Sequence, residues 1–216
     1  MTLRRWLAVC GVAAPILIVA TFVVGGNTPD DKANAARVVS YYRDHKTSNI
    51  IAALLITIAA VLLVLFAARL REVLRGDGLH GDAMPIAAFG GAVIVAAGLL
   101  LMAAVHFALI QAADHRFAAP AQTLNVFDSN DFFLLIGGIS VLMLAAGIST
   151  VRNPVLPRWL GWVAIVLGIL ALAGPVGFFA MMASLLWILV VAILLFVRRD
   201  LATAEEADHG AVVVTS

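Results

Sequence analysis

One histidine lies inside a long apolar run of the sequence, and no other residue in such a run is ionisable. His106 is about one turn from the end of the run 86–110. An ionisable group inside a membrane segment is a functional candidate, because its burial in hydrocarbon is costly. Other polar residues follow it, at the end of the same run and just before the next one. The candidate polar cluster consists of His106, Gln111, Asp114, His115, Asp128 and Asp131.

This cluster could bind a divalent metal ion or move a proton, because histidines and carboxylates do both. Its spacing matches no recurrent metal motif, however, and all members except His106 lie where water can solvate them. A structural or interfacial role is the alternative, in which Asp128 caps the helix that follows. We therefore expect no catalytic, cofactor-binding or metal-binding residue, and we keep the cluster as a candidate only.

The motifs of several enzyme and carrier classes are absent from the sequence. It contains no glycine-framed nucleophilic serine, no His-Glu-x-x-His and no phosphate-binding glycine loop. No Asp, Glu or Lys falls in the middle of an apolar run, where proton-coupled carriers usually have one. A haem held by two imidazoles would need a second buried histidine. These absences favour a protein that is not an enzyme and binds no cofactor.

The elements that must position these residues are membrane-spanning helices. The chain has 216 residues, of which 63% are hydrophobic and 12% charged, whereas soluble domains carry about 25% charged residues. Four apolar runs are each long enough to cross ~30 Å of hydrocarbon. The spans predicted from them cover about 6–24, 50–69, 86–110 and 132–151, with Arg69 at the end of the second. Their apolar residues do not alternate as barrel strands do, so the sequence predicts an all-α, polytopic transmembrane helical bundle.

The last apolar run, 159–197, is too long for one helix and short for two. Proline and glycine at 174–177 predict a reversal within it. Two spans result, at about 158–174 and 178–197, and they bring the total to six. We expect one transmembrane domain over residues 1–200 and a disordered cytoplasmic tail over 201–216.

Positive charge predicts how the six spans are oriented. Nine of the fourteen Lys and Arg residues stand at the N-terminus or at alternate connections, and they mark the cytoplasmic side by the positive-inside rule. The nine are Arg4, Arg5, Arg69, Arg71, Arg75, Arg152, Arg158, Arg198 and Arg199. We expect a multi-pass protein of the bacterial inner membrane with both termini in the cytoplasm.

The first outer connection is expected to hold a short helix over about 29–45. Thr28 and Pro29 resemble a helix start, and Val38 and Tyr42 share one apolar face at helical spacing. An amphipathic helix of this kind would lie on the outer membrane surface, with Tyr41 and Tyr42 as anchors.

Small residues recur on single helix faces, where they would let helices approach closely. Gly91 shares a face with Gly98, Gly161 with Gly168, and Gly138 with Ala145. We interpret these stripes as packing seams between spans.

The whole chain resembles uncharacterised six-span bacterial membrane proteins, frequent in actinobacteria, that are grouped as a domain of unknown function of the 4386 type. Three features carry the resemblance. They are Tyr-Tyr-Arg-Asp-His at 41–45, Gly90-Gly91, and Trp-Leu-Gly-Trp at 159–162. The resemblance implies a six-span helical fold, and it supplies no activity and no site residues.

Three functions remain open from the sequence. The first is a non-enzymatic membrane protein that acts through the lipid bilayer, another membrane protein or a second copy of itself, with no nucleic acid involved. The second is a passive carrier or channel for a small neutral or apolar solute. The third is an outer-face metal-dependent enzyme that uses His106, Asp114, His115 and Asp128.

Overall fold

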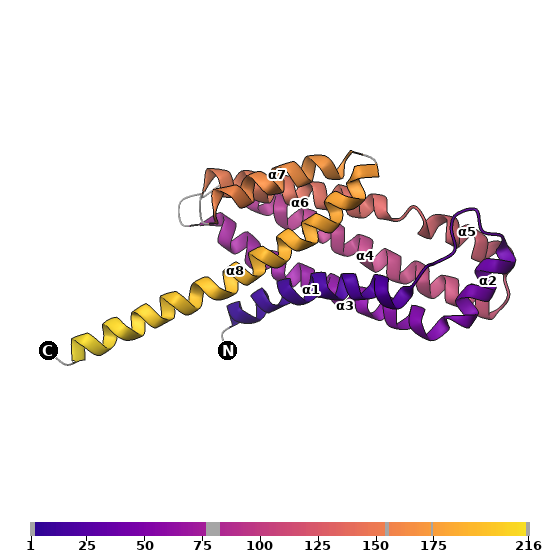
Figure 1. Cartoon of the computed structure of the whole chain (residues 1–216), viewed down its shortest axis with the longest axis horizontal. Helices are drawn as coiled ribbons and strands as arrows, with labels where there is room; N and C mark the ends of the chain where they lie inside the picture. Colours follow the sequence, from indigo (N-terminus) through magenta and orange to yellow (C-terminus); the bar gives the residue numbers. More distant parts are fainter. Residues whose placement is uncertain (1–2, 77–82, 154–155, 174, 215–216) are drawn as a thin grey trace.

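The computed structural model of the chain is a bundle of helices (Figure 1). It describes residues 3–76, 83–153, 156–173 and 175–214, with residues 3, 4, 175 and 198–214 as backbone only. These residues form eight helices and no strand. The helices are α1 (Leu3–Gly25), α2 (Ala35–Asp44), α3 (Lys46–Arg75), α4 (Met84–Asp114), α5 (Ala118–Asp128), α6 (Phe132–Arg152), α7 (Arg158–Ala171) and α8 (Pro175–Val214). The predicted all-α class is confirmed.

The long helices form a closed ring. Following the ring, α1 packs on α3, α3 on α4, α4 on α6, α6 on α7, α7 on α8, and α8 returns to α1. Five segments of the described chain are long and apolar enough to cross a membrane, which makes this a membrane protein. They are Arg5–Gly25, Lys46–Arg75, Met84–Asp114, Ala118–Arg152 and Val176–Val197.

The sixth predicted span is the exception, because α7 is shorter than the other five. Its 14 residues extend over only about 21 Å at ~1.5 Å per residue. The predicted reversal is confirmed, since α7 ends at Ala171 and α8 begins at Pro175; Gly174 lies outside the described residues. The turn between the two helices lies well short of α2 and α5 (Figure 1). The bundle is therefore shallower on this side.

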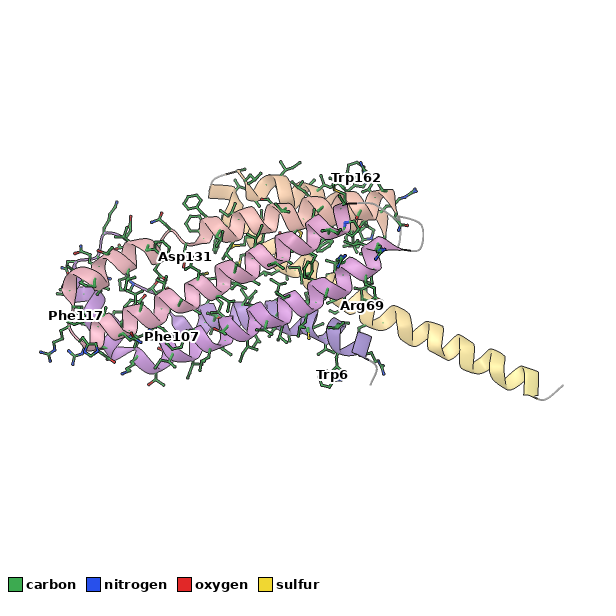
Figure 2. All side chains as sticks on the ribbon, turned by 180° about the vertical axis from the view of Figure 1, so that it is seen from behind. Trp6, Arg69, Phe107, Phe117, Asp131 and Trp162 are labelled. Atoms are coloured by element: carbon green, nitrogen blue, oxygen red, sulfur yellow. The ribbon has the colours of Figure 1, made fainter. Side chains whose placement is uncertain are left out.

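The two ends of the bundle differ in character. Figure 2 places Trp6, Arg69 and Trp162 at one end, which we call the basic end, and Phe117 at the other. Helices α2 and α5 cover this second, capped end (Figure 1). Arg69 is 8% exposed and pairs with Glu72, while the Arg5 guanidinium lies 5.2 Å from the centre of the Phe196 ring.

Helix α2 differs from the predicted surface helix in two respects. It begins at Ala35, because Asn34 rather than Thr28 caps it by accepting a hydrogen bond from the Arg37 amide at 2.9 Å. Its apolar face is turned to the protein instead of the lipid. Val38 and Tyr42 are fully buried with residues of α4 and α5. The amphipathic pattern is thus confirmed, but α2 is a lid on the bundle.

Two other predicted segments are not tested. The backbone of α8 is helical as far as Val214, and the disordered tail expected over 201–216 stays a prediction. The inner loop with Asp77, His80 and Asp82 lies outside the described residues.

The glycine stripes are packing seams, as predicted. A Cβ added to Gly91 would lie 2.4 Å from the backbone nitrogen of Leu142, and one at Gly138 would lie 2.7 Å from that of Val95. These contacts join α4 to α6. A Cβ at Gly161 would lie 3.0 Å from the carbonyl oxygen of Gly147, which joins α7 to α6 in the same way.

Candidate functional site

Three of the six candidate residues meet at a cavity near the capped end of the bundle. The cavity has a volume of about 250 Å³, and His106, Asp128 and Asp131 all line it. The rest of its wall is mainly apolar and comes from α1 and the connection after it, and from α3, α4, α6 and α8. Its larger apolar residues are Phe22, Ile56, Met102, Phe132, Leu135, Phe178 and Met181. The cavity is therefore an interhelical space with ionisable groups confined to one part of its wall.

Each ionisable residue comes from a different position in the fold. His106 lies within α4, Asp128 is the last residue of α5, and Asp131 occupies the N-cap position of α6. The connection between α5 and α6 is only three residues long, so it holds both carboxyl groups at one corner of the bundle. Figure 2 labels Asp131 at this junction.

The sharp turn after α4 allows α5 to fold back beside it. Arg116 has a φ of 56°, and the amide of Phe117 donates to the carbonyl of Ala112 at 2.8 Å. This is the Schellman arrangement that ends many helices. It reverses the chain within two residues, and α5 then packs on α4.

One ring nitrogen of His106 makes a hydrogen bond and also lies near a carboxyl group. Its Nδ1 donates to the carbonyl oxygen of Met102 at 3.1 Å and lies 3.2 Å from Oδ1 of Asp128. A carbonyl oxygen can only accept, so Nδ1 must carry the proton. His106 and Asp128 therefore lie within ion-pair distance of each other at one corner of the cavity.

Asp131 has no such partner. It is 7% exposed, and no donor among the described residues reaches its buried Oδ2. Buried carboxylates are normally paired or hydrogen-bonded, because an isolated one is costly. Asp131 lines the cavity, so a molecule bound there would lie beside a carboxyl group that lacks a hydrogen-bond donor.

Tyr42 belongs to this corner, although we predicted it only on the apolar face of α2 and as a membrane anchor. Its ring lies edge-on to that of His106, with the centroids 6.3 Å apart. Burial raises the pKa of the Tyr42 phenol well above its ordinary value, and the Asp128 carboxylate raises it further. Tyr42 therefore stays protonated beside the two acids. Its place on the apolar face of α2 was the only sign of this in the sequence.

The other three candidate residues point elsewhere. Asp114 pairs with Lys46, with Nζ and Oδ2 2.5 Å apart, and the His115 ring stacks on that of Phe117 at 5.5 Å. Gln111 is exposed. Within the described residues, no three His, Cys, Asp or Glu side chains are grouped as metal ligands. The contacts of Asp114 and His115 do not assemble the ligand set of the metal-enzyme hypothesis.

The arrangement is suited to binding a cation. Two carboxyl groups lie beside one histidine, so a cation in the cavity would balance the negative charge that remains when both carboxyl groups are ionised. A ligand that also donates hydrogen bonds would suit the Asp131 carboxyl group, whose Oδ2 accepts none from the described residues. Ammonium groups meet both requirements, because they carry a charge and several donors.

The helices α2 and α5 hold this corner closed. The Tyr41 hydroxyl donates to the carbonyl of Gly25 at 2.8 Å, and the side-chain amide of Asn125 donates to the carbonyl of Asp30 at 2.8 Å. The first bond ties the end of α1 to α2, and the second ties the connection after α1 to α5. Gly25 of α1 and Gly26 and Thr28 of this connection also line the cavity, so α2, α5 and the site form one unit.

Comparisons with known families and proteins leave this geometry as the basis for a function. No protein-family model, no curated protein and no solved structure matches the chain. The resemblance to the 4386-type proteins stays a prediction.

Proposed function

We propose that this chain is a non-enzymatic, multi-pass membrane protein that binds a small ammonium-bearing molecule in the cavity beneath its lid. One observation carries the proposal. Asp131 is buried, lines the cavity and has an oxygen that accepts no hydrogen bond from the described residues. His106 lies 3.2 Å from Asp128, whereas no donor among the described residues reaches Oδ2 of Asp131, which leaves Asp131 to recognise the ligand.

We also propose that six helices cross a bacterial inner membrane, with the basic end in the cytoplasm. The distribution of Lys and Arg supports this orientation. The lid and the cavity would then lie on the outer side. In this arrangement the site receives its ligand from outside the cell or from the outer leaflet.

Binding of butylammonium to the purified protein in lipid nanodiscs tests the site. We expect saturation-transfer NMR to detect binding, and we expect Asp131→Asn to weaken it at least tenfold. Hydrogen bonds to charged groups contribute about 1.5–3 kcal/mol, and 1.4 kcal/mol is a tenfold change in affinity. Asn also caps helices well, so this variant removes the charge and keeps the start of α6.

Asp114→Asn is the matched control, because Asp114 is exposed and pairs with Lys46 away from the cavity. Its affinity for butylammonium should equal that of the unaltered protein. Equal affinity in Asp131→Asn would refute the proposal and indicate that Asp131 merely holds a proton. If butan-1-ol bound as well as butylammonium, the site would select for no charge, and the passive carrier of a neutral solute would be favoured.

A further inference from the structure

The cavity continues inward along the axis of the bundle. A narrow space of about 30 Å³ shares five lining residues with it and is entirely apolar. The shared residues are Phe22, Ile56, Met102, Leu135 and Met181. The ionisable corner is therefore joined to an apolar interior by side chains that belong to both.

This inner space borders a groove on the outer surface of the bundle. The groove, of about 580 Å³, runs between α1 and α8 and is lined only by apolar residues. Met182 and Leu185 line both the groove and the inner space. Phe179 is 71% exposed and Leu186 64%, so the groove is open to the surrounding lipid.

The wall between the groove and the inner space contains residues that can change conformation easily. Pro15 lies inside α1 and lines the groove. It has no amide proton for the hydrogen bond to the preceding turn, which makes a helix bend most easily at this level. Met181 and Met182 have flexible side chains that can repack around a ligand. A small displacement of α1 from α8 would therefore connect groove and cavity.

We infer that the ligand is a single-chain cationic amphiphile, whose ammonium head binds beside Asp131 and whose tail leaves through the gap between α1 and α8 into the bilayer. The inference rests on the proposed function for the head and adds the tail and its route. A charged corner and an apolar groove that share an inner lining match the two ends of such a molecule. At about 30 Å³ the inner space is about the size of one water molecule, so the tail fits only after α1 has moved away from α8.

Photolabelling in nanodiscs tests this route. The probe is dodecylammonium with a diazirine in its tail, and mass spectrometry locates the labelled residues. We expect labels on α1 near Ile16 and Val19 and on α8 near Phe179 and Met182. Excess butylammonium should reduce this labelling at least tenfold, because both molecules need the same head site.

Two substitutions on α8 separate the route from ordinary lipid contact. Leu185→Trp should block the passage and lower the labelling of the groove several-fold. Ile193→Trp is the matched control, because Ile193 is 45% exposed on the same helix and lines no part of the groove. Labelling in this control should be unchanged. Undiminished butylammonium binding shows that either variant is folded.

The outcomes distinguish the two proposals. Labelling spread evenly over lipid-facing residues such as Trp162 and Val166, and insensitive to butylammonium, would overturn the tail route. The head site would still stand if butylammonium binding depended on Asp131. Absence of that dependence would instead refute the head site, and the route with it. Labels confined to the groove of the unaltered protein and removed by butylammonium would support both, even if Leu185→Trp failed to fold.

Discussion

Arg116 forms a strained turn that helps to bring the residues of the site together. It occupies the left-handed region, with a φ of 56°, where side chains with a Cβ are disfavoured by about 1–2 kcal/mol. Glycine is the usual residue at this position of a Schellman turn. The strain is tolerated because the turn brings α5, and with it Asp128, back toward His106.

Replacing Arg116 with Gly should therefore stabilise the protein. We expect Arg116→Gly to raise the free energy of unfolding by up to about 1 kcal/mol, because glycine relieves the strain and loses part of that gain to its greater freedom in the unfolded chain. Thermal unfolding in detergent measures the effect. Arg116→Ala removes the same side chain and keeps the Cβ, so it should give no increase. Equal stability of the two variants would contradict the argument.

At the same scale, the sequence predicted which residues could do chemistry but not which would meet. Six polar residues satisfied the same criterion of lying near the outer end of the spans. Only His106, Asp128 and Asp131 meet. They do so because of the left-handed turn at Arg116 and the three-residue connection between α5 and α6. Arginine is an unusual residue for such a turn, so nothing local predicted it. Asp114 pairs with Lys46, which lies 68 residues away in the sequence, and so does not join the cluster.

Among the elements, the seam between α4 and α6 offers a sharp test of close packing. A Cβ at Gly91 would meet backbone atoms of Leu142, whereas one at Gly90 would meet nothing within 4 Å. We expect Gly91→Ala to lower the stability by about 1–3 kcal/mol through overpacking. Gly90→Ala should be neutral or slightly stabilising, since Ala favours helix. If thermal unfolding showed the same loss of stability in both variants, close packing at Gly91 would not be what holds α4 against α6.

The positions of the helices in the sequence were largely predictable, because long apolar runs and prolines determine them. Which neighbour the apolar face of a helix packs against was not predictable. The spacing of Val38 and Tyr42 identified the apolar face of α2, but lipid and protein both accept such a face. In the structure this face packs on buried residues of α4 and α5 and not on lipid. Such tertiary contacts leave no local pattern in the sequence of α2.

For the whole molecule, the orientation in the membrane is testable by labelling from one side. Single cysteines at the exposed positions Ala36 and Ala83, in a Cys10→Ala background, report on the lid and on the basic end. In intact cells a membrane-impermeant maleimide should label Ala36→Cys and leave Ala83→Cys unlabelled. Both should react after the cells are opened. Labelling of Ala83→Cys alone in intact cells would reverse the proposed topology.

The brevity of α7 has a consequence for the membrane itself. In the six-crossing arrangement, about 21 Å of helix meets hydrocarbon that is ~30 Å thick. Lipids beside a short span thin locally or tilt to cover it, at a modest free-energy cost for each ångström. If α7 crosses the membrane, the bilayer should be thinner on the side of the α7–α8 hairpin and keep its full thickness beside α3 and α4. A protein with this lopsided outline deforms a thick bilayer more than a thin one, and it should gather where the lipids are short.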